Sequence, residues 1–159
     1  MRIAIVSDTH MPRGNRRLPD ACAAELQAAD AVLHAGDLAR AEVLAQVQAF
    51  GPPVHAIRGN VDEPGIGLPE RLEVELGGVR FAMVHDPGPK QGRFERLVGR
   101  FPDADVVVFG HTHMPEHEER DGVQIFNPGS PTERRRAPAH TMGRATVADG
   151  RATLELVTL

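Results

Sequence analysis

The sequence predicts an α/β protein in which two β-sheets form a sandwich with helices on the outside. Apolar, β-branched runs alternate with helix-like stretches in the first two thirds of the chain, which indicates βαβ crossovers. Two-residue turn signals dominate the last third and are typical of antiparallel hairpins. We therefore expect one sheet from the early strands and a second sheet from the hairpins.

In the first part of the chain, three short runs are apolar almost throughout, as expected for strands buried on both faces of a sheet. Helix-like stretches separate them, and in the second stretch Val43, Val47 and Phe50 fall on one stripe. The predicted strands here are residues 2–6, 31–34 and 54–57, and the predicted helices are residues 19–29 and 40–50.

Beyond residue 65, three glycine-containing pairs, Gly77-Gly78, Asp121-Gly122 and Asp149-Gly150, predict hairpins. A third helix is predicted where large apolar residues recur at helical spacing, and a dense β-branched run follows it. The predicted strands are residues 71–76, 79–85, 105–109, 117–120, 123–126, 144–148 and 152–157, and the helix is residues 91–101.

Length and composition indicate an ordinary globular chain. With 159 residues and no linker or internal repeat, we expect a single domain over residues 1–159. The formal net charge of −4 does not indicate a nucleic-acid partner. Cys22 is the only cysteine, which excludes an intrachain disulfide and argues against a thiolate metal site. The sequence contains no leader and no stretch that could span a membrane, so we expect a cytoplasmic protein.

Five predicted strands end in polar side chains. In open α/β sheets, ligands bind beyond the carboxyl ends of the strands, so we expect these side chains to form one site. Residues two apart on an extended chain point the same way, which pairs Asp8 with His10 and His111 with His113. Gly36, Gly59 and Gly110 are expected to let the backbone turn there. The full set is Asp8, His10, Asp37, Asn60, His85, His111 and His113.

The chemistry of this set indicates metal binding. It contains imidazole, carboxylate and amide groups but no sulfur. Imidazole suits several transition metals, whereas carboxylate and carbonyl oxygens suit Mn and harder ions. Seven ligands are too many for one tetrahedral site with an open position, and they suit two adjacent metals. A carboxylate that supplies an oxygen to each ion would complete such a centre.

In order and spacing, these residues resemble the calcineurin-like metallophosphoesterase superfamily, specifically its small single-domain phosphodiesterase branch. The resemblance rests on Asp8-x-His10, Gly36-Asp37, Gly59-Asn60, His85 and Gly110-His111-x-His113, and covers nearly the whole chain. The segment NPGSPT, residues 127–132, also resembles the stretch that follows the last motif in that branch. Any one motif alone is weak, but five in order are specific.

The resemblance implies a four-layer αββα sandwich of two mixed β-sheets flanked by helices, and a centre of two divalent metal ions. Asp8, His10, Asp37 and His113 would hold the first metal, and Asp37 would bridge to the second, which Asn60, His85 and His111 complete. We predict Mn²⁺, with Fe, Ni and Zn²⁺ as alternatives that the ligands accept. A metal-bound hydroxide would hydrolyse a P–O bond of a phosphodiester substrate.

Val61 departs from many members of the superfamily. Many relatives have histidine after the asparagine, and that histidine is thought to protonate the leaving oxygen; here the stretch is Gly59-Asn60-Val61-Asp62. Valine cannot donate a proton, and general acid catalysis contributes about 10²–10⁴-fold in rate. We therefore expect a preference for diesters with good leaving groups. Asp62 is expected either to orient a neighbouring group or to cap a turn.

Several residues outside this set are candidates for substrate contacts or for packing. Arg13 and His140 are candidate substrate contacts, because arginine suits phosphate and His140 lies in a Pro-rich loop. His34 and His55 lie inside apolar runs and are interpreted as packing residues, and Ser130 has no dedicated base.

The alternatives to a phosphodiesterase are a phosphomonoesterase or nuclease on the same centre, and a non-catalytic interaction module such as the retromer scaffold subunit of the superfamily. The family also allows a homo-oligomer.

Overall fold

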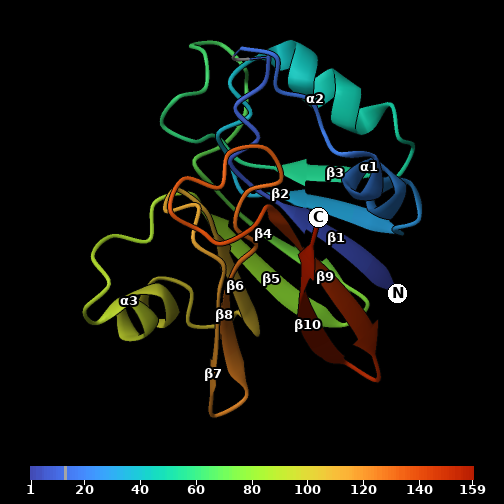
Figure 1. The fold of residues 1–159 in the computed structure, drawn as a ribbon. Helices are drawn as coiled ribbons and strands as arrows, with labels where there is room; N and C mark the ends of the chain where they lie inside the picture. The colour runs from blue at the N-terminus through green and yellow to red at the C-terminus, as the bar shows by residue number, and fades with distance from the viewer. Residues whose placement is uncertain (13) are drawn as a thin grey trace.

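Two five-stranded mixed β-sheets pack face to face, with helices on their outer faces (Figure 1). The structure is a computed structural model that describes residues 1–12 and 14–159. The predicted α/β class and sandwich of two sheets are therefore confirmed. No helix in the described part of the chain is both long enough and apolar enough to cross a membrane.

The first sheet contains three parallel strands and an antiparallel hairpin at one edge. β1 and β2 pair in parallel from Ile3 with Ala31 to Val6 with His34. Both strands are buried on both faces, which explains their apolar sequences. The strand order is β10 (Arg151–Thr158), β9 (Thr141–Ala148), β1 (Arg2–Val6), β2 (Ala31–His34) and β3 (Val54–Ala56).

The second sheet also has three parallel strands, here between two antiparallel edge strands. The edge strand β4 alternates exposed and partly buried residues, as expected for a strand with one face toward solvent. Gly77-Gly78 and Asp121-Gly122 form the predicted hairpin turns with positive φ at both positions. The strand order is β4 (Arg71–Leu76), β5 (Val79–Val84), β6 (Val106–Phe109), β8 (Val123–Asn127) and β7 (Glu116–Arg120).

Three apolar clusters define four layers. The central cluster, which includes Ile5, Leu33 and Phe81, fills the space between the sheets. A second cluster joins the outer face of the first sheet to helices α1 (Asp20–Gln27) and α2 (Ala41–Gln48). A third joins the outer face of the second sheet to helix α3 (Arg93–Arg100). The order of layers is helix, sheet, sheet, helix.

The C-terminal hairpin contradicts the expected division of the strands between the sheets. β9 pairs with β1, from Arg2 with Thr146 to Ile5 with Gly143, so this hairpin extends the sheet of the early strands. The reason is burial: Ala145 and Val147 face the central core, while Met142 packs in the cluster with α1 and α2. β9 also covers the edge of β1, which would otherwise present unpaired backbone groups.

Candidate metal centre

The six parallel strands of the two sheets end at one side of the sandwich, and the candidate ligands follow five of these strands. The loops after β1, β2 and β3 supply residues from the first sheet, and those after β5 and β6 supply residues from the second. A hydrogen bond from His111 N to Asp8 Oδ2, at 3.0 Å, ties the two sets together. The seven predicted residues are therefore brought to one place: Asp8, His10, Asp37, Asn60, His85, His111 and His113.

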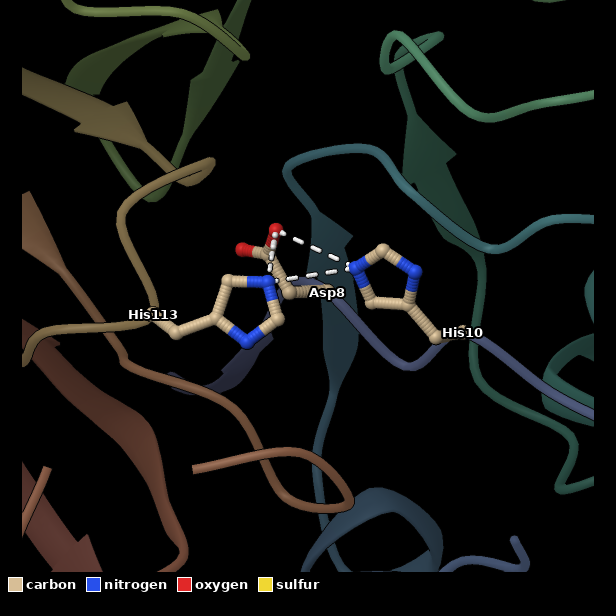
Figure 2. A group of neighbouring side chains, drawn as sticks. All are labelled: Asp8, His10 and His113. Atoms are coloured by element: carbon tan, nitrogen blue, oxygen red, sulfur yellow. Dashed lines mark hydrogen bonds and ion pairs between the residues drawn. The ribbon is translucent and has the colours of Figure 1, made fainter. Parts of the chain in front are cut away.

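Asp8, His10 and His113 form the first cluster (Figure 2). His113 Nε2 lies 3.2 Å from Asp8 Oδ1 and 3.2 Å from His10 Nε2, and His10 Nε2 lies 3.8 Å from Asp8 Oδ1. All three side chains are buried. Ligand atoms that share one ion at about 2.1 Å are roughly 3.0–3.4 Å apart in octahedral or tetrahedral geometry. The cluster is close to that spacing.

Asp37 lies between the first cluster and a second one. Its Oδ2 is 3.4 Å from His10 Nε2 and 3.3 Å from His85 Nε2. Beyond it, Asn60 Oδ1 lies 3.1 Å from His85 Nε2 and 2.8 Å from His111 Nδ1. His111 and His113 therefore belong to different halves of the site. The pairing expected from their two-residue spacing is wrong, and they lie apart as the family resemblance implies.

The backbone explains this error, because the loops are not extended. Asp8, His10, Asp37, His111 and His113 all have φ between 44° and 68°, a left-handed conformation in which Asp and His are enriched. Left-handed residues interrupt the regular alternation of a strand, so the two-residue spacing does not set the direction of the side chains. Such strained residues gather at functional sites.

Two of the glycines serve close packing rather than unusual backbone angles. A Cβ at Gly59 would lie 2.1 Å from Asp37 Oδ1, and a Cβ at Gly110 would lie 2.0 Å from Ser7 Oγ and 2.8 Å from Asp8 Oδ2. Neither glycine has a positive φ. Their role differs from the expected turn: they leave room for the carboxylates of Asp8 and Asp37.

Hydrogen bonds determine which nitrogen of two histidines faces the site. His85 Nδ1 bonds the carbonyl of Ala35 at 2.7 Å, and His113 Nδ1 bonds the carbonyl of Glu133. Because a carbonyl oxygen only accepts, the Nδ1 atoms carry the protons and donate. Nε2 of each neutral ring then presents its lone pair to the cluster, the arrangement in which histidine binds metals.

The histidines also hold the two carboxylates in their charged form. Burial would raise the pKa of Asp8, but the neighbouring imidazoles of His10, His113 and His85 lower it below its ordinary value. Burial likewise opposes ionisation of Asp37, yet His85 and the amide of Val61 lower its pKa. For His85, desolvation lowers the pKa, and the larger combined effect of Asp37 and Asp8 raises it.

Asp62 is a positioning residue, which decides between its two predicted roles. Its carboxylate accepts hydrogen bonds from the backbone amides of Asp37, Ala39 and Gly59 at 3.1, 2.6 and 2.7 Å. These amides belong to the loops after β2 and β3. Asp62 thus holds together the two loops that carry Asp37 and Asn60.

The last residue of β8 and the segment that follows it support the loops of the site through hydrogen bonds. Asn127 Nδ2 donates to the carbonyl of Gly110 at 3.0 Å, Ser130 Oγ donates to the carbonyl of Asp8 at 2.8 Å, and Thr132 Oγ1 donates to the carbonyl of Thr9 at 2.6 Å. Sequence reasoning did not assign these roles to the three residues. The resemblance of NPGSPT to the family segment was the signal that could have found them.

Three other predicted residues have different outcomes. His34 is buried, accepts from Gly36 N at 3.2 Å and lies 3.2 Å from Thr9 Oγ1, so its assignment as a packing residue is confirmed. His140 Nδ1 is buried and makes no hydrogen bond within the described residues, so its contact with substrate stays a prediction. Arg13 lies outside the described residues.

Val61 sits at the rim of the centre. Its amide donates to Asp37 Oδ1 at 3.0 Å, while its side chain is 39% exposed. It lines a cavity of about 630 Å³ together with Met11, Pro12 and Arg40, among others. The position after Asn60 is therefore apolar and open to a ligand.

The residues present fit a metal ion. Asp8 Oδ1 is fully buried and has no hydrogen-bond partner within the described part of the chain. It faces imidazole nitrogens of His10 and His113. Burying a charged oxygen without a partner is costly, and a divalent cation between these atoms would provide the missing interaction.

Comparison with known proteins agrees with this geometry. Residues 1–150 match the family model described as "Calcineurin-like phosphoesterase superfamily domain". A probable metallophosphoesterase from Methanothermobacter thermautotrophicus is 33% identical over 135 residues, which cover 83% of this chain and 78% of that protein. A phosphodiesterase from Methanocaldococcus jannaschii is 31% identical over 147 residues, covering 81% of this chain and 83% of that protein.

Among solved structures, a single mutant of Vps29 from Entamoeba histolytica has a TM-score of 0.79 and 25% identity. The similarity covers 100% of this chain and 99% of that one. The resemblance found in the sequence is thereby confirmed. The chain belongs to the calcineurin-like phosphoesterase superfamily.

Proposed function

We propose that this chain is a metal-dependent phosphodiesterase with a centre of two divalent metal ions. The observation that carries the proposal is the position of Asp37 Oδ2, 3.4 Å from His10 Nε2 and 3.3 Å from His85 Nε2. An oxygen placed between two groups of imidazoles suits a ligand shared by two ions. Membership in the superfamily and the similarity to a phosphodiesterase support the reaction class.

The ligands divide between the two ions. Asp8, His10 and His113 would hold the first ion, Asn60, His85 and His111 would hold the second, and Asp37 would bind both. The set of nitrogen and oxygen donors without sulfur supports Mn²⁺, with Fe, Ni and Zn²⁺ as alternatives. The predicted cytoplasmic location, single domain and homo-oligomer stay predictions.

When bound, two such ions activate water and stabilise the attacking and leaving oxygens of a displacement at phosphorus. The chain supplies the surroundings of this reaction. The protonated Nδ1 atoms of His85 and His113 fix their rings against backbone carbonyls. The buried carboxylates of Asp8 and Asp37 are kept ionised by their histidine neighbours.

The substrate preference follows from Val61. Because this exposed side chain at the rim cannot donate a proton, a leaving group that departs as a stable anion is favoured. We therefore expect aryl phosphodiesters to be hydrolysed faster than unactivated alkyl monoesters. Faster hydrolysis of alkyl monoesters, measured over a panel of both classes, would contradict this preference.

The central test is the substitution Asp37→Asn. Metal-stripped protein should regain hydrolysis of an aryl phosphodiester when Mn²⁺ is added, and Asp37→Asn should reduce this activity by at least about 100-fold, because the bridging charge is lost. Asp149→Asn is a matched control, since Asp37 and Asp149 both have positive φ, 59° and 50°, and Asp149 lies in the distant β9–β10 turn. A folded, metal-loaded protein without turnover would contradict the enzyme and favour an interaction module.

A further inference from the structure

The sixth parallel strand also delivers a carboxylate to the centre. The loops after the other five parallel strands carry the seven predicted ligands, and the loop after β8 carries Glu133. Glu133 Oε2 lies 3.7 Å from His10 Nε2. We propose that Glu133 is an additional metal-site residue whose carboxylate faces the first ion from the side of His10, and that it favours Mn²⁺ over Zn²⁺. This inference rests on the proposed function.

Unpartnered atoms point to Glu133 independently of its position in the fold. In residues 1–12 and 14–159, only two buried side-chain oxygens lack a hydrogen-bond partner, Asp8 Oδ1 and Glu133 Oε2. Both face the same atom, His10 Nε2, at 3.8 and 3.7 Å. Orphaned buried oxygens need an explanation such as an ion. Because both unpartnered oxygens face the same imidazole nitrogen, one cation bound between them would account for both.

The charge balance around His10 leads to the same conclusion. Three carboxylates surround its Nε2, from Asp8, Asp37 and Glu133, at 3.8, 3.4 and 3.7 Å. Like charges in a buried site repel one another. Arg16 Nη2 pairs with Glu133 Oε1 at 2.8 Å, which orients the carboxylate but leaves Oε2 directed at His10. A divalent ion would compensate the remaining negative charge.

A further carboxylate affects which metal is preferred. Zn²⁺ is generally four-coordinate, and Asp8, His10, Asp37 and His113 already supply four groups. Carboxylate oxygens suit Mn²⁺ better than they suit softer ions. Glu133 should therefore contribute more to the affinity for Mn²⁺ than to that for Zn²⁺, whether it contacts the ion directly or through one water.

The test is Glu133→Gln, which retains the size of the side chain and removes its charge. Dissociation constants for Mn²⁺ and Zn²⁺, measured by calorimetry on metal-stripped full-length protein, should show about 10- to 100-fold weaker binding of Mn²⁺ and a smaller loss for Zn²⁺. Glu133→Asp, which keeps the charge, should retain more of the Mn²⁺ affinity. An unchanged Mn²⁺ constant in Glu133→Gln would overturn the proposal.

Two controls separate a metal role from a structural one. Glu25 on α1 is another carboxylate paired with arginines, namely Arg2 and Arg144. Glu25→Gln should leave metal binding unchanged. Arg16→Gln breaks the ion pair with Glu133 but leaves the carboxylate, so Mn²⁺ should bind at least as tightly as in the unaltered chain. If Arg16→Gln and Glu133→Gln weakened binding equally, the ion pair would be the cause and the proposal would be wrong. Failure of the unaltered chain to bind metal would instead contradict the proposed function.

Discussion

At the residue scale, Asp62 shows how a side chain outside the ligand set determines the site. Both of its carboxylate oxygens accept backbone amides from loops that carry candidate ligands. An asparagine at position 62 would have only one side-chain oxygen, so at least one of these three backbone amides would face an NH₂ group instead of an acceptor. A buried donor left without an acceptor costs about 1–3 kcal/mol.

We therefore predict that Asp62→Asn lowers the free energy of unfolding by about 1–3 kcal/mol and weakens metal binding. Urea denaturation of metal-free protein and metal titration would measure the two effects. Asp105→Asn is the control, because Asp105 Oδ2 accepts a single exposed amide, that of Arg80. Equal stability of the two variants would argue against the role of Asp62.

His34 makes a prediction about pH. Desolvation lowers its pKa from 6.5 to about 4, and the opposing effects of Asp62, Asp8 and Asp37 do not restore it. Between about pH 4 and pH 6.5, His34 is therefore protonated in the unfolded state but neutral in the folded state. The contribution of His34 to the free energy of unfolding is fully present above pH 6.5 and is lost as the pH falls toward 4. The total loss from this residue is about 3 kcal/mol.

His34→Gln should remove this contribution, so that unfolding free energies of the variant and the unaltered chain converge as the pH falls from 7 to 4. The comparison needs metal-free protein, because Asp8, Asp37, Asp62 and His85 lie close to His34 and would bind metal or respond to it. Parallel stability curves for the two proteins over this range would contradict the prediction.

At the element scale, α3 covers the outer face of the second sheet. Phe94, Leu97 and Phe101 pack against residues of that sheet, including Val107 and Ile125. Arg93 on the same helix also pairs with Glu116 at the start of β7, at 2.5 Å. No other helix in the described residues packs in this cluster, so the apolar side chains of α3 dominate the stability of that layer.

Leu97→Ala should lower the free energy of unfolding by about 2–5 kcal/mol, because Leu97 is fully buried and its truncation leaves a cavity. Arg100→Ala, at an exposed position of the same helix, should change it by less than about 0.5 kcal/mol. Thermal and urea unfolding would distinguish the two variants. A comparable loss in both would contradict the conclusion that packing of the apolar side chains stabilises this layer.

At the scale of the whole molecule, the candidate centre joins the two sheets. Asp8, His10, Asp37 and Asn60 come from the first sheet, and His85, His111 and His113 come from the second. A bound ion would therefore connect layers that otherwise meet mainly through apolar packing. Ligand binding to the folded state alone contributes about 2.7 kcal/mol at 100 times the dissociation constant.

We expect Mn²⁺ at that concentration to raise the thermal midpoint by roughly 5–10 °C, and a chelator to reverse the increase. His113→Ala should reduce the shift, because it removes a ligand atom 3.2 Å from both Asp8 and His10. His117→Ala is the control, since His117 lies exposed on β7. A midpoint unaffected by metal in the unaltered chain would contradict a metal that links the sheets.

Much of the fold could be predicted from local pattern. The apolar runs of β1 and β2, the stripe on α2 and the Asp-Gly turns depend on neighbours in the chain, so their periodicity predicts them. The sheet that receives the β9–β10 hairpin could not be predicted in this way. That choice depends on the edge of β1 and on the two buried faces of β9, which are properties of packing.

The pattern of residues along the chain is enough to identify the side chains of the candidate centre, because the carboxyl ends of parallel strands meet at one side of a sheet and polar residues follow five such strands. The family resemblance also implies how these side chains divide between two ions, but the directions in which they point depend on the tertiary structure. Left-handed residues interrupt the extended backbone of these loops, so His111 and His113 do not point the same way as their two-residue spacing predicts. The tertiary structure alone decided between the two predicted roles of Asp62 and placed Glu133 beside His10, because both depend on distances between loops that are separate in sequence and close only after the two sheets have packed.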